Sequence, residues 1–111
     1  MAAEKGPRAP EGLQSRSQRL WSAVNKDFEL APHELALLEE ALRALDRADQ
    51  ARTIVDEFGP VTVDRFGQAR VHPAVGVERD ARGLFVRCLR ELGLDAATID
   101  PRPLRLKGRD Q

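Results

Sequence analysis

The chain has 111 residues, in which 18 Lys and Arg balance 18 Asp and Glu, so its formal net charge is zero. This balance excludes a uniformly basic nucleic-acid coat protein and an acidic disordered tail. Hydrophobic residues make up 41% of the chain but aromatic residues only 5%, so the core must consist of Leu, Val and Ala, a composition typical of helical proteins. A chain of this length fits one small domain, to which contacts with partners would add stability.

The cysteine and histidine content argues against disulfides and metal sites. Cys88 is the single cysteine, and His33 and His72 are far apart in the sequence, so we expect no internal disulfide, no zinc site and no cofactor. The start, MAAEKGPRAP, holds no apolar stretch of the kind found in signal peptides, and no apolar run approaches the about 20 residues of a membrane span. We therefore expect a cytoplasmic protein without membrane contacts.

The two ends of the chain are expected to be flexible. Residues 1–14 hold two Gly and two Pro among small and charged residues, too little apolar surface to offset the entropy lost on ordering. Residues 95–111 contain Pro101 and Pro103 in a basic stretch, which excludes a regular helix or central strand there. This tail is interpreted as a docking segment or as a frayed terminus without contacts. Residues 15–94 are expected to form a single helical domain.

A short amphipathic helix is predicted to begin near Ser15. Its large apolar residues recur at spacings of three and four: Leu20, Trp21, Val24 and Phe28. Ser15 or Ser17 is available as the N-cap. Trp21 is expected to be an anchor in the core rather than a surface on which a ligand stacks.

A long helix is predicted from Pro32 to Phe58, because Pro suits the first helical turn. Gly59 is expected to end it as a left-handed cap, followed by Pro60. The apolar stripe expected in the core or in subunit contacts comprises Leu35, Leu38, Leu42, Leu45, Val55 and Phe58, continued by Val61 and Val63. A helix of about 40 Å is too long for so small a domain to cover on every side, so part of it should meet another subunit.

Residues 61–72 are predicted to form a short β-hairpin, since β-branched residues alternate on both sides of a loop that contains Gly67. A two-stranded ribbon is not stable alone in water, so it must pack on the helices or on a neighbouring copy. A second long helix is predicted to begin at Pro73 and to end at Gly93 in a Schellman motif. His72 is expected to cap this helix or to close the hairpin. The predicted fold is thus mainly α: a short N-terminal helix and two long antiparallel helices joined by a short hairpin, with flexible ends.

The sequence holds no recognisable catalytic constellation. His33 and Glu34 are adjacent in a first helical turn and do not face each other. Cys88 lies on an apolar stripe, where a small buried hydrophobe is the default. Phosphate-binding loops, dinucleotide-binding loops and zinc-protease motifs are missing from the sequence. We therefore expect a protein that is not an enzyme.

Charge is distributed unevenly along the chain. Residues 32–58 carry seven acids and three bases, whereas residues 61–111 carry seven acids and ten bases. Most of these charges are expected only to solvate helix faces. The residues expected to contact DNA or a protein partner are Arg16, Arg19, Arg102, Arg105, Lys107 and Arg109. A ring of copies would sum their phosphate contacts.

The joints between these elements follow a recognisable order. They are Leu20-Trp21, the run from Leu30 to Ala41, the run from Gly59 to Val63, Gly67, the run from His72 to Val75, and the run from Arg87 to Leu94. Together, over roughly residues 17–95, they resemble the small subunit of phage terminases, of the type with two long helices separated by a short hairpin.

The resemblance implies a non-catalytic subunit of a DNA-packaging motor in the cytoplasm of a bacterial host. Such subunits assemble as rings, engage double-stranded viral DNA, and regulate a separate large subunit that has the ATPase and nuclease. Many of them carry an N-terminal helix-turn-helix, for which residues 1–14 are too short, so no base-reading residue is assigned. The alternative is a small helical adaptor or antitoxin-like regulator that binds one protein partner and no DNA.

Overall fold

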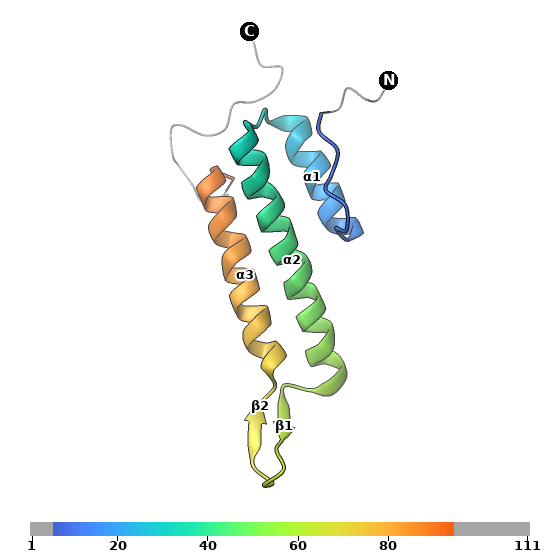
Figure 1. The fold of residues 1–111 in the computed structure, drawn as a ribbon, viewed down its shortest axis with the longest axis vertical. Coiled ribbons are helices and arrows are strands. Elements are labelled where there is room, and N and C mark those ends of the chain that lie inside the picture. Colours follow the sequence, from blue (N-terminus) through green and yellow to red (C-terminus); the bar gives the residue numbers. More distant parts are fainter. Residues whose placement is uncertain (1–5, 95–111) are drawn as a thin grey trace.

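Three helices and one hairpin make up the structure. A computed structural model describes residues 6–94 of the 111, and the predictions for residues 95–111 lie outside them. The elements are α1 (Ser15–Asp27), α2 (Pro32–Phe58), β1 (Val61–Val63), β2 (Ala69–Val71) and α3 (Pro73–Leu92). In Figure 1, α2 lies in the middle, with α3 antiparallel to it on one side and α1 beside its N-terminal half on the other. The mainly helical class and the hairpin between the two long helices are confirmed.

The main core lies where α1 meets the N-terminal half of α2. Its buried members are Leu13, Trp21, Leu38, Leu42, Leu45 and Leu92. Trp21 is only 4% exposed, so its predicted role as a core anchor is confirmed, and its Nε1 donates to the carbonyl of Pro7 at 2.9 Å. A second, smaller cluster of Ala51, Val55 and Ala74 lies between α2 and α3. The apolar packing therefore thins towards the hairpin.

Residues 6–14 lie against α1 and α2, which differs from the flexible arm expected for this part of the chain. Leu13 is buried in the main core, and the Arg43 guanidinium donates to the carbonyl of Glu11 at 3.1 Å. Gln18 Nε2 donates to the carbonyl of Leu13 at 2.7 Å. The Leu13 side chain and several backbone carbonyls are enough to order this segment, because the groups they contact are already held in place by α1 and α2.

The N-terminus of α1 is held by a buried carboxylate of α2. The predicted caps, Ser15 and Ser17, are wrong, because the N-cap is Gln14 and no side chain caps it. Ser17 instead lies inside the helix, where its hydroxyl donates to Asp46 Oδ1 at 2.5 Å. The N–H of Gln14 donates to Asp46 Oδ2 at 2.9 Å. Asp46 thus lies near the positive end of the α1 dipole, which favours its negative charge.

The ends of the long helices confirm two predictions and correct one. At the end of α3, the N–H of Gly93 donates to Arg90 and the N–H of Leu94 donates to Leu89, as a Schellman motif requires. His72 has both expected roles, since its Nδ1 accepts from the N–H of Ala74 at 3.0 Å and its N–H donates to Pro60 at 2.8 Å. The left-handed cap expected at Gly59 is wrong. Its φ of 86° is positive, but its ψ of 160° directs the chain outward into β1.

Replacing Asp46 with Ala is expected to lower the free energy of unfolding by about 2–3 kcal/mol, because the Ser17 hydroxyl and the Gln14 N–H lose a buried charged acceptor. Urea unfolding followed by helical circular dichroism measures this loss. The matched control is Gln50→Ala on the exposed side of α2, which should change stability by less than about 0.5 kcal/mol. Equal effects of the two substitutions would contradict the role assigned to Asp46.

Candidate functional site

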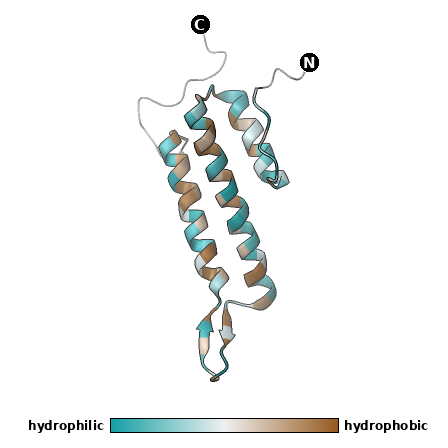
Figure 2. Cartoon of the chain, viewed as in Figure 1, coloured by the Kyte–Doolittle hydropathy of each residue, from teal (hydrophilic) through white to brown (hydrophobic). Residues whose placement is uncertain are grey.

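Exposed apolar side chains gather at the hairpin end of the molecule. Phe58 is 65% exposed, Val61 52%, Val63 69%, Phe66 76% and Val71 66%. Figure 2 shows brown segments continuing beyond the helix ends into the hairpin, which projects from the two long helices. Soluble monomers rarely leave such a contiguous set of apolar residues in water, and such sets mark interaction sites.

The register of the hairpin places its apolar residues on one face. Val61 pairs with Val71 and Val63 with Ala69, so these four side chains lie on the same side of the ribbon, while Thr62 and Arg70 lie on the other. All four apolar residues are exposed, so no described part of the chain covers this face.

Both edges of the hairpin are also open. The hydrogen bonds from Asp64 to Gln68 and from His72 to Pro60 identify the pairs whose backbone groups point inward. Because hydrogen-bonded and non-hydrogen-bonded pairs alternate, the N–H and C=O groups of the four apolar residues point outward. Among residues 6–94 these outward groups have no partner, so the hairpin offers apolar side chains and open backbone groups from the same residues.

The predicted apolar stripe divides into two parts. Leu38, Leu42, Leu45 and Val55 are buried in the chain's own core, and Leu35 is half-buried. Phe58, Val61 and Val63 are exposed. The structure thus does not bring the eight residues together, and of these eight the three at the hairpin end are the exposed ones.

The loop of the hairpin is fixed by Asp64. Its Oδ1 accepts from the N–H groups of Phe66 at 2.8 Å and Gln68 at 2.9 Å, and its Oδ2 accepts from Arg70 Nε at 2.9 Å. The N–H of Gln68, followed by the Arg70 guanidinium, lowers the pKa of Asp64 below its ordinary value of 3.8. The Arg65 guanidinium lies 5.2 Å from the centre of the Phe66 ring. These contacts give the exposed end a defined shape.

The lowered pKa of Asp64 predicts how the hairpin responds to acid. Because the folded-state value lies below 3.8, the contribution of the carboxylate is present above 3.8 and is lost as the pH falls through the folded-state value. The amide proton shifts of Phe66 and Gln68, measured by NMR, should therefore titrate with a midpoint below pH 3.8. An amide titration centred at or above that pH would show that these bonds are not formed, and Asp64→Asn should abolish the titration.

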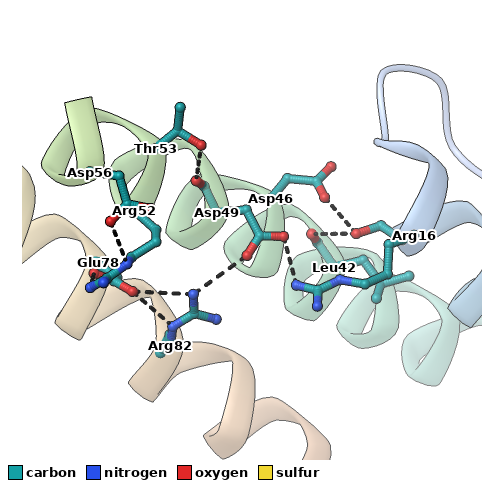
Figure 3. Close-up of polar contacts among 10 residues, drawn as sticks. Arg16, Leu42, Asp46, Asp49, Arg52, Thr53, Asp56, Glu78 and Arg82 are labelled. Atoms are coloured by element: carbon teal, nitrogen blue, oxygen red, sulfur yellow. Dashed lines mark hydrogen bonds and ion pairs between the residues drawn. The ribbon is translucent and has the colours of Figure 1, made fainter.

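An ion-pair network on one side of α2 links the three helices, as Figure 3 shows. Asp49 lies 2.6 Å from Arg16 of α1 and 3.5 Å from Arg82 of α3. Arg82 continues to Glu78 at 3.2 Å, and Glu78 lies 3.7 Å from Arg52. Each exposed pair contributes at most about 1 kcal/mol. The main consequence is that their charges are neutralised within the chain.

This network engages Arg16, one of the residues predicted to contact DNA. Arg16 is already paired with Asp49, whereas Arg19 is exposed and makes no ion pair within residues 6–94. The remaining predicted contacts, Arg102, Arg105, Lys107 and Arg109, lie outside the described residues. The structure therefore separates the two α1 arginines that the sequence analysis grouped together.

Sequence reasoning missed a second cation on the face that presents Arg19. Lys26 lines a shallow hollow along α1 with Ser15, Gln18, Arg19, Ser22 and Ala23. The signal was present in the sequence, because Ser15, Arg19, Ser22 and Lys26 are spaced at intervals of four, three and four residues, which places them on one helix face.

Cys88 and the potential metal ligands of the described residues are the remaining candidates for chemistry. Cys88 is buried as expected, and burial, followed by the nearby Glu40 carboxylate, raises the pKa of its thiol. Residues 6–94 contain no group of three His, Cys, Asp or Glu side chains able to hold a metal ion. Within the same range, none of the helices has the length and apolar character needed to cross a bilayer.

Comparisons of the chain with models of known protein families, with curated proteins and with solved structures find no match. The resemblance to terminase small subunits therefore depends on the joint residues and the order of elements. The surfaces of the described residues that bear on function are the hairpin end and the outward face of α1.

Proposed function

We propose that this protein is the small subunit of a viral DNA-packaging terminase. It is a non-catalytic, ring-forming subunit that engages double-stranded viral DNA and regulates the large ATPase and nuclease subunit in the host cytoplasm. The observation that carries this proposal is the hairpin end, where five apolar side chains are more than half exposed at the tip of two paired helices. Such an end suits a subunit that works only in an assembly.

Self-assembly through this end is energetically reasonable. Fully burying one Val or Phe side chain contributes about 1.5–3 kcal/mol, so covering these partly exposed side chains on both copies gives a free energy of the same order as the about 4–15 kcal/mol cost of association. The open edges add backbone hydrogen bonds to the apolar contact. Asp64 has already fixed the loop, so little further ordering is needed.

Assembly through the hairpin would leave the outward face of α1 uncovered. Figure 1 shows that the hairpin extends from one end of the helix pair and that α1 lies beside the other end. Copies joined at their hairpins would each present the unpaired Arg19 and Lys26. Repetition around a ring then supplies the DNA affinity that one neutral chain lacks.

The second candidate is a helical adaptor that binds one protein partner. The ion-pair network favours it, because Arg16, Arg52 and Arg82 are paired with carboxylates of the same chain and are therefore less available to DNA phosphates. Filter binding to duplex DNA at rising salt separates the two. A terminase subunit should bind with an affinity that falls steeply with salt, and it should alter the ATPase rate of a large subunit, whereas an adaptor should do neither.

The substitution Val63→Lys is expected to dissociate the assembly, because it places a charge on the apolar face of the hairpin. Size-exclusion chromatography with light scattering measures the change in mass. The monomer's free energy of unfolding should change by less than about 0.5 kcal/mol, because this side chain is exposed.

The matched control for Val63→Lys is Thr62→Lys, which adds the same charge to the opposite face of the same strand. It should leave the mass unchanged. If Val63→Lys retains the wild-type mass, the hairpin face is not the assembly surface. If the wild-type chain is monomeric at all concentrations, the ring-forming function itself is wrong.

A further inference from the structure

The outward face of α1 combines two cations with two hydroxyl groups. Ser15, Arg19, Ser22 and Lys26 all lie on it and are all exposed. The opposite face of the same helix holds Ser17, Trp21 and Asn25, which are buried. The core contacts of α1 therefore fix which side chains point to solvent.

The two cations on this face are unpaired. Neither Arg19 nor Lys26 makes an ion pair with any residue in the part of the chain that the structure describes, in contrast to Arg16 on the same helix. The only acid in α1 is Asp27, its last residue, which lies about 100° around the helix axis from Lys26 and makes no ion pair with either cation. No carboxylate of α1 thus competes for the two positive charges.

The chemistry of the face suits phosphate rather than bases or protein. Guanidinium, ammonium and hydroxyl groups are those that contact phosphate oxygens in protein–DNA complexes. The hollow is lined by Gln18 and Ala23 besides the four residues above, so it has no large apolar or aromatic side chain to anchor a protein partner or to stack on a base.

We propose that this face of α1 binds the phosphodiester backbone of duplex DNA without reading its sequence. The inference rests on the proposed function, because one copy offers only two cations and several copies are needed for useful affinity. Arg19 and Lys26 each neutralise one phosphate, while the hydroxyls of Ser15 and Ser22 donate to phosphate oxygens. Arg16 contributes to the fold and not to this site.

The test measures the binding of the full chain to two duplexes of unrelated sequence over a series of salt concentrations. Each cation that neutralises a phosphate contributes about 0.9 to the slope of log affinity against log salt for every engaged copy. Arg19→Gln and Lys26→Gln should each lower the slope by that amount per copy, and equally on both duplexes. Light scattering should show the wild-type mass for both variants, because neither residue lies at the hairpin end.

The matched control is Arg47→Gln, which removes an exposed cation of α2. It should leave the slope unchanged. If the wild-type chain binds DNA and the double variant retains its slope, the α1 face is not the site, although the proposed function stands. If the losses depend on the duplex sequence, backbone-only recognition is wrong. If the assembled wild-type chain does not bind duplex DNA even at low salt, both the inference and the DNA-engaging function are wrong.

Discussion

The buried carboxylate of Asp46 is the contact on which the arrangement of α1 depends. It accepts hydrogen bonds from the first residues of α1 and thereby fixes how that helix is rotated against α2. With this rotation, Trp21 points into the core and Arg16 reaches Asp49, three residues further along α2. Arg19 and Lys26 are left on the outer side. The buried acid and the core contacts of α1 together determine which basic residues are available to a partner.

The zero net charge of the chain does not show that its cations fall into two groups, those paired within the chain and those exposed without a described partner. Arg16, Arg52 and Arg82, one on each helix, are paired with carboxylates of the same chain. The unpaired cations of α1 lie away from that network. A count of charges cannot distinguish the two groups, because pairing depends on which helix faces meet.

Much of the fold could be predicted from sequence because its signals are local. Pro32 and Pro73 begin the long helices, and the Gly93-Leu94 stop and the His72 cap act through backbone groups within a few residues. The errors arise where a distant residue decides the outcome. Ser17 has the chemistry of an N-cap, but Asp46, 29 positions away, draws its hydroxyl into the core.

The candidate site was predictable only in part, for the same reason. The apolar stripe from Leu35 to Phe58 has one helical period in sequence, but its burial depends on where α1 and residues 6–14 lie. These segments cover the N-terminal half of α2 and end well before Phe58. The sequence period identifies apolar positions, whereas the length of the covering segments decides which of them remain exposed.

The hairpin end and the outward face of α1 lie apart, so self-assembly through the first does not interfere with DNA binding through the second. The molecule is 66 Å long and 19 Å thick, with the hairpin at one end and α1 beside the other. A contact between hairpins buries apolar residues without approaching Arg19 or Lys26. Had the cations lain beside Phe58 and Val63, assembly would have had to desolvate them at a cost of several kcal/mol each. Because they lie apart, copies can join at their hairpins while each α1 face keeps its charge in water.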